Sequence, residues 1–267
     1  MSEIDIQIAR RVTPSSLVRA RDLLKAEWTK LRSVRSTYWI LLIAVVTAIG
    51  GSALLASASA PGGTSLFDPL ASTFVAWLEY PVLAVGILGV LVFTSECSTG
   101  QIRTTFAAVP QRRAVLASKA AVVRIVTLTF GEALAFASFG LSEMIRSGHH
   151  QRISFAQPGV PGAVLVAGFS LFVIAMVGVG LSAIIRHTAG AVAALPAIIY
   201  LPLVVLALPS PWNDEIGRFT LLMAAYQAVS LHPRPDLLSP TLPMLVLLAW
   251  PALVLGVAAA LITRRDA

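Results

Sequence analysis

Six long apolar segments constrain what this chain of 267 residues can fold into. A hydrocarbon core of ~30 Å is crossed by about 20 apolar residues in a helix, and backbone groups in that core must be hydrogen-bonded within the segment itself. The chain is 57% hydrophobic and 12% charged, whereas about a quarter of residues in soluble domains are charged. We therefore expect an all-α membrane protein whose six transmembrane helices lie at 38–60, 75–95, 115–143, 161–185, 189–209 and 242–262.

The net charge of +7 follows a topological pattern. With the N-terminus inside, fifteen lysines and arginines fall in inner segments, four fall in outer segments, and Arg124 lies within a span. Lysine and arginine are enriched on the cytoplasmic side of membrane proteins. We expect a multi-pass protein of the cytoplasmic membrane with both termini in the cytoplasm. Its charge then reflects contact with the lipid bilayer and indicates no nucleic-acid partner.

A polar tail at 1–14 precedes an amphipathic segment at 15–37. Basic residues separate apolar residues that recur every three or four positions, which is typical of a helix in the headgroup plane of the inner leaflet. A solvated helix without a further role is the alternative. The recurring apolar residues are Leu17, Ala20, Leu24, Trp28 and Leu31.

Ionisable residues inside a span are costly and need partners. Glu132 lies deep in the third span, where it must face the bundle, a water-filled path or a partner. Arg124 lies about 12 Å away along a helix axis, which is too far for direct pairing. Both are candidates for a substrate path, with a structural contact as the alternative for Glu132. Glu143, near the outer end of the span, is expected to be solvated.

Small residues mark one face of the fifth span. Gly190, Ala194 and Ala197 would let another helix approach closely, either in a dimer interface or within the monomer. The following outer connection, 210–241, contains an apolar stretch at 216–231 that is too short to cross the membrane. We expect a partly inserted, re-entrant outer segment.

No catalytic or metal-binding motif is present in the sequence. It contains neither G-x-x-x-x-G-K-[ST] nor H-E-x-x-H, so we expect no enzymatic activity from this chain alone. The adjacent His149 and His150 have no third ligand in reach, and we expect no metal site.

The segment "TSECSTGQIRTTFAAVPQRR" at 94–113 interrupts the apolar runs on the inner side. Ile102, Phe106 and Val109 supply one apolar face, which predicts a helix over 97–108 along the inner surface. Gly100 would let a partner's backbone come near, and Pro110 would end the helix. Glu96 stands where the second span ends.

These residues form E-x-x-x-G-x-[IL]-x-T, from Glu96 to Thr104, followed by P-x-x-R from Pro110. With the preceding amphipathic helix and the six spans, the chain resembles the type-2 ABC exporter permeases over nearly its whole length. The stretches "EWTKLRSVRSTYW" at 27–39 and "SECSTGQIRTTFAAVPQRRAVLASKA" at 95–120 are similar to small permeases of high-GC Gram-positive bacteria. Cys97 departs from the pattern, since related sequences often have tyrosine or another large polar residue there.

The resemblance implies the permease subunit of an ATP-driven exporter. Two cytosolic ABC ATPase subunits would bind ATP and magnesium, a second permease, identical or homologous, would complete the pathway, and this chain would hold no cofactor. A coupling loop at 96–113 would contact the ATPase, with the elbow helix at 15–37 nearby. The residues implied in coupling are Glu96, Gly100, Gln101, Arg103, Thr104 and Pro110, and those of the elbow helix are Leu24, Glu27, Trp28, Lys30 and Leu31.

Two further expectations follow. Glu96 could pair with a basic residue of the loop, of the elbow helix or of the ATPase, and a water-exposed carboxylate is the alternative. The alternative function is a membrane-embedded sensory or immunity subunit that binds a ligand without transporting it.

Overall fold

The structure, a computed structural model, describes residues 20–58, 70, 73, 74, 77, 80–148, 153–205, 207–210, 212–230 and 242–264. The predicted tail at 1–14, the start of the elbow segment, the histidine pair and much of the outer connection lie outside these residues. The described part is helical and contains no strand. Its helices are α2 (Ala20–Ser33), α3 (Arg35–Ala58), α5 (Tyr80–Ser98), α6 (Gln101–Ala108), α7 (Arg112–Ser147), α8 (Val160–Ile185), α9 (Thr188–Ile199), α10 (Leu201–Val205), α11 (Trp212–Gly217), α12 (Leu221–Val229) and α13 (Leu242–Arg264).

Five of these helices, α3, α5, α7, α8 and α13, are long and apolar enough to cross a membrane. They correspond to the first four expected spans and to the last one. The 36 residues of α7 extend about 54 Å at 1.5 Å per residue, so this helix continues beyond a ~30 Å hydrocarbon core. The described part is thus an all-α, multi-pass bundle, as the composition predicts.

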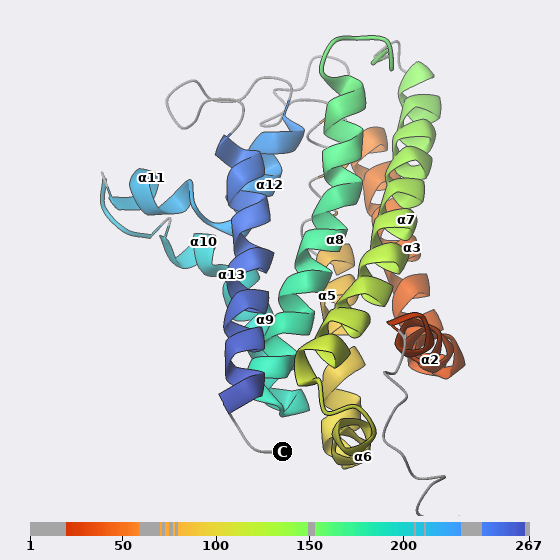
Figure 1. Cartoon of the computed structure of the whole chain (residues 1–267). Coiled ribbons are helices and arrows are strands. Elements are labelled where there is room, and N and C mark those ends of the chain that lie inside the picture. The colour runs from red at the N-terminus through yellow and green to blue at the C-terminus, as the bar shows by residue number, and fades with distance from the viewer. Residues whose placement is uncertain are drawn as a thin grey trace, which may run out of the picture.

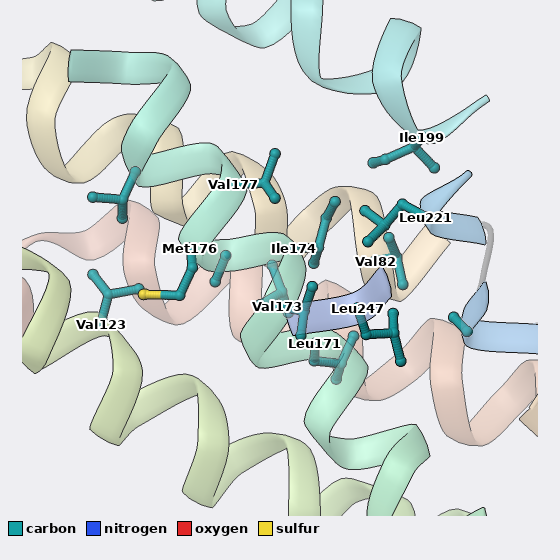
Figure 2. Packing of buried hydrophobic residues seen from close by; sticks show 14 of the residues in the cluster. Val82, Val123, Leu171, Val173, Ile174, Met176, Val177, Ile199, Leu221 and Leu247 are labelled. Carbon is teal, nitrogen blue, oxygen red and sulfur yellow. The ribbon is translucent and has the colours of Figure 1, made fainter. Parts of the chain in front are cut away.

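Helix α8 lies at the centre of the bundle and contacts α5, α7, α9, α12 and α13 (Figure 1). Its side chains pack against all five of these helices, and Figure 2 shows Met176 beside Val123 of α7 and Leu171 beside Leu247 of α13. Gly89 brings α5 into backbone contact with α8, since a Cβ on Gly89 would overlap the carbonyl of Ala175. Small residues permit such close helix packing in membranes.

The expected fifth span is interrupted. Helix α9 ends at Ile199, and α10 begins at Leu201 after Tyr200 leaves helical geometry. Pro202 follows, and a proline has no backbone N–H to donate to the carbonyl four residues earlier. Pro196 lies within α9 without ending it. A sixth crossing by α9 and α10 together stays a prediction.

Short helices follow where the re-entrant outer segment is expected. Helix α12 packs against α8 and α13, with Leu221, Ala224 and Ala225 buried. It lies toward the opposite end of the bundle from α6 (Figure 1). Its insertion into a membrane stays a prediction.

One end of the bundle gathers the segments expected inside the cell. Helix α6, the turn from α8 to α9 and the C-terminal end of α13 lie together there, and α2 lies at the side of the same half (Figure 1). The connection from α7 to α8 lies at the other end. A guanidinium hydrogen bond of Arg112 to the carbonyl of Ile262, at 3.5 Å, links the start of α7 to the end of α13.

The orientation of α2 differs from the expected apolar stripe. Leu31 is buried and Leu24 is partly buried, but the indole of Trp28 is 46% exposed. Glu27 occupies the buried side instead, with 5% of the residue exposed. Helix α2 turns the carboxylate of Glu27 toward Lys119 of α7, and its placement in the headgroup plane stays a prediction.

Candidate functional site

At the end of the bundle where α6 lies, the chain passes from α5 through a short turn into α6 and through a second turn into α7. Helix α5 extends to Ser98, and α6 begins at Gln101 after a turn of two residues. Gly100 has φ of +72°, a left-handed conformation that glycine adopts without steric cost. A Cβ there would meet nothing within 4 Å. Gly100 therefore serves the turn, and no backbone of the described residues approaches it closely.

Helix α6 is amphipathic in the way the sequence predicts. Phe106 and Val109 are buried, and Ile102 is partly buried against the main core. The guanidinium carbon of Arg112 lies 5.3 Å from the centre of the Phe106 ring. Helix α6 ends at Ala108 and α7 begins at Arg112, so Pro110 lies between them. The opposite, exposed side presents Gln101, Arg103 and Thr104.

Four charged residues meet where α5 leads into α6, and we call them the charge cluster: Glu27 and Lys30 of α2, Glu96 of α5 and Lys119 of α7. The Nζ atom of Lys119 donates to Glu96 Oε1 at 2.6 Å and to Glu27 Oε2 at 2.8 Å. The Nζ atom of Lys30 donates to the same Glu96 oxygen at 2.8 Å and to Glu27 Oε1 at 3.0 Å. Three helices are thereby tied together where α5 leads into α6.

Burial makes each charge of the cluster depend on its partners. The side chain of Lys119 is 0% exposed and those of both glutamates 5%, so each charge has lost its water and depends on its partners. The two positive and two negative charges balance. Glu96 Oε2 is buried and has no hydrogen-bond partner in the described part of the chain.

Lys30 is the member of the cluster nearest to solvent, with 36% of its side chain exposed. Burial lowers its pKa, but hydrogen bonds and attraction from Glu96 and Glu27 outweigh burial and raise the pKa above 10.5. A raised lysine pKa means that the stabilisation is fully present below pH 10.5 and is lost only as the pH rises through the folded-state pKa. Lys30 is therefore charged throughout the physiological range.

Sequence reasoning missed the role of Lys119. It was counted only as an inner positive charge, and nothing local connects it to Glu96, 23 residues earlier, or to Glu27, 92 residues earlier. The available signal was its position, since a lysine enclosed by apolar residues at the start of a span needs a partner. Glu96 was expected to find a basic residue, and the structure supplies Lys30 of the elbow helix and Lys119.

The two candidate substrate-path residues are not brought together. Glu132 lies against Gly168 of α8, where an added Cβ would be 2.7 Å from Glu132 Oε2. That oxygen is buried and has no hydrogen-bond partner among the described residues. Arg124 is exposed, with its guanidinium carbon 5.9 Å from the centre of the Phe172 ring. Both residues lie along the seam between α7 and α8, and no ion pair joins them.

The opposite end of the bundle holds a second polar cluster. Arg146 is 1% exposed and donates to Thr73 Oγ1 at 2.7 Å and to Glu143 Oε1 at 3.3 Å. The other oxygen of Glu143 accepts from the backbone N–H of Ile153 at 2.8 Å. The expectation of a solvated Glu143 is therefore wrong. Helix α7 continues to Ser147, which places Arg146 in the bundle instead of an outer loop.

The small residues of the fifth span lie outside the fully buried side of α9, although Ala194 packs against the edge of the main core. Ala191, Leu195 and Ile199 form the buried side of α9, whereas Gly190 and Ala194 are partly exposed and Ala197 is exposed. Their use as a dimer interface stays a prediction.

Within the described residues, no three side chains of His, Cys, Asp or Glu are grouped in a way that could hold a metal ion. The charge cluster joins α2, α5 and α7 where α5 leads into α6. Comparisons with models of known protein families and with curated proteins find no match to this chain.

Proposed function

We propose that this chain is the permease subunit of an ATP-driven exporter of the type-2 ABC class, and that α6 is the helix through which a separate ATPase acts on it. One observation carries the proposal. An amphipathic helix at the end of the bundle is anchored on one side by Phe106 and Val109, while its other side presents exposed polar residues. Such a helix suits a groove on a cytosolic partner.

The charge cluster supports the mechanical part of the proposal. A movement of α6 has to pass through the Gly100 turn into α5, or past Pro110 into α7. Because Glu96 and Lys119 join these two helices at 2.6 Å and Glu27 adds α2, the three helices would move as one unit. The ATPase changes the equilibrium between permease states only through contacts that differ between its own states.

The remaining parts follow from the resemblance. Two ATPase subunits would bind ATP and magnesium, and a second permease, identical or homologous, would complete the path. Glu132, whose Oε2 has no hydrogen-bond partner among the described residues, is the candidate substrate contact. The segment at 210–241 would cap the path on the outer side.

Substitutions on the exposed side of α6 test the proposal. In cells that also express the ATPase, the double variant Arg103→Glu/Thr104→Trp should still insert in the membrane but should lose co-purification with the ATPase and transport. Gln157→Trp, an exposed position between α7 and α8, is the matched control and should retain both. Glu96→Ala and Gly100→Trp should also abolish transport.

Two outcomes would contradict the proposal. The first is a purified wild-type chain that never recovers a nucleotide hydrolase. The second is full transport by the α6 double variant. A complex that binds its ligand and assembles with the ATPase, yet moves no ligand into sealed vesicles, would instead identify the sensory or immunity subunit.

A further inference from the structure

A cavity of about 320 Å³ lies beside the charge cluster, between the α2–α3 joint, α5 and the start of α7. Its volume falls in the range of small-molecule sites, about 300–1,000 Å³. The floor is apolar, with Leu31, Leu88 and Val122 buried together as a separate hydrophobic cluster. The mouth lies at exposed residues such as Ser36 and Ser95. The cavity therefore has one solvent-facing side and one apolar side.

Hydrogen-bond donors converge on the solvent-facing side of the cavity. An ammonium group has three N–H donors, and Lys30 uses two of them on Glu27 and Glu96, which leaves one. Thr37 is 7% exposed and lines the cavity, and its hydroxyl makes no hydrogen bond with the described part of the chain. The hydroxyl of Ser36 likewise makes no hydrogen bond with the described part of the chain.

Ser36 and Thr37 belong to the first turn of α3, which begins at Arg35. A helix N-terminus leaves backbone N–H groups without partners in the helix and carries a partial positive charge. The N–H of Thr37 donates to the carbonyl of Val34 at 3.2 Å, so the two hydroxyls and the other N–H groups of this turn are the donors that suit an anionic group with several acceptor oxygens. The carboxylates lining the cavity do not oppose this, because both are neutralised by lysines and Glu96 Oε2 is buried from solvent.

The apolar floor decides the class of ligand. A free phosphate would use the donors but would leave Leu31, Leu88 and Val122 beside water, whereas a lipid uses both sides of the cavity. Helix α2 is amphipathic and α5 and α7 are apolar, so the cavity lies where an interfacial helix meets spans. We propose that the cavity binds one phospholipid, with its phosphodiester at Lys30, Ser36 and Thr37 and the start of an acyl chain on the floor. This binding needs no ATPase and stands apart from the proposed function.

Binding can be measured on the purified full chain in detergent, by the rise in its unfolding temperature and by native mass spectrometry. Palmitoyl-oleoyl phosphatidylglycerol should bind saturably with one molecule per chain. The diacylglycerol with the same acyl chains lacks the phosphate, and glycerol 3-phosphate lacks the chains. Both should bind at least tenfold more weakly, because each can use only one side of the cavity.

Paired variants locate the site. Ser95→Trp fills the cavity from α5, whereas Ser98→Trp places the same side chain at an exposed position of α5 outside the cavity. Thr37→Val removes the hydroxyl without changing the shape of the side chain, and Thr47→Val makes the same change further along α3, where the hydroxyl donates to Ile43 within the helix. Ser95→Trp and Thr37→Val should each weaken lipid binding about tenfold, as expected for a lost hydrogen bond to a charged group or a blocked site. Both controls should bind as the wild type does.

Each other outcome overturns the inference. Equal binding of the phospholipid and the diacylglycerol would reduce the cavity to an apolar surface for any lipid. Glycerol 3-phosphate binding as tightly as the lipid would make it a site for a soluble anion. If Thr37→Val and Ser95→Trp retain the lipid, bound phospholipid lies elsewhere on the chain.

Discussion

The charge balance of the charge cluster depends on Lys119. It is fully buried and it joins Glu96 and Glu27, which lie on different helices. Paired charges of this kind contribute little net free energy relative to apolar residues, but removal of one partner leaves an uncompensated charge. Lys119 is therefore expected to be far more sensitive to substitution than the exposed lysine of α2, Lys25.

Lys119→Met should lower the free energy of unfolding by about 3–5 kcal/mol, because Glu27 and Glu96 then keep an excess negative charge in a buried site. The measurement is reversible denaturation of the chain in mixed micelles. Lys25→Met removes the same charge from an exposed site and should change stability by about 0.5 kcal/mol or less. Adding Glu27→Gln to Lys119→Met restores the charge balance and should recover part of the loss; an equal loss in the double variant would show that charge is not the cause.

Gly100 makes its contribution through backbone conformation. Gly100→Ala should destabilise the α5–α6 junction by about 1–2 kcal/mol, because an L-residue is strained at positive φ, although the added Cβ meets nothing within 4 Å. Gly140→Ala in α7 adds a methyl group to equally open space, and there alanine should stabilise the helix by about 0.5–1 kcal/mol. Opposite signs of the two effects, measured by thermal unfolding, support the conformational role, and equal signs contradict it.

At the scale of elements, α8 organises the bundle through close backbone contacts. Gly178 faces α5, where an added Cβ would overlap the carbonyl of Gly86, and Gly168 faces Glu132 of α7. These contacts explain why α8 is buried on several sides. They also make α8 intolerant of small increases in volume, since a packed core cannot expand locally without moving a helix.

Gly178→Ala should destabilise the bundle by about 1–3 kcal/mol through overpacking, because the obstacle is backbone. Gly162→Ala lies in the same helix with nothing within 4 Å of the added methyl group and should be neutral or slightly stabilising. Both can be compared by thermal unfolding in detergent. If the two variants are equally stable, α5 and α8 do not make the backbone contact described above.

For the whole molecule, the two ends of the bundle are expected to face opposite sides of the membrane. Cys97 is the single cysteine, so Cys97→Ser gives a cysteine-free background. In that background Thr104→Cys, on α6, should react with a membrane-impermeant maleimide only in inside-out vesicles. Gln157→Cys, between α7 and α8, should react only in intact cells. Labelling of Thr104→Cys from outside would place α6 on the wrong side for any cytosolic ATPase.

The long apolar helices were predictable because their signal is local. Apolar length alone identifies α3, α5, α7, α8 and α13, and the spacing of Ile102, Phe106 and Val109 identifies α6. The break between α9 and α10 also has a local signal in the sequence, since Pro202 has no backbone N–H for the hydrogen bonds that a continuous helix requires. Hydropathy counts apolar residues and does not register that loss.

Local patterns are enough to predict the helical membrane architecture, the amphipathic helices at one end of it and the positive charge of the segments there, because each depends on neighbours a few residues apart. The partners of Glu96, the buried side of α2 and the position of the cavity emerge only from the folded arrangement of the helices. Those outcomes join residues as far apart as Glu27 and Lys119. They depend on the rotation and packing of whole helices, which no local pattern specifies.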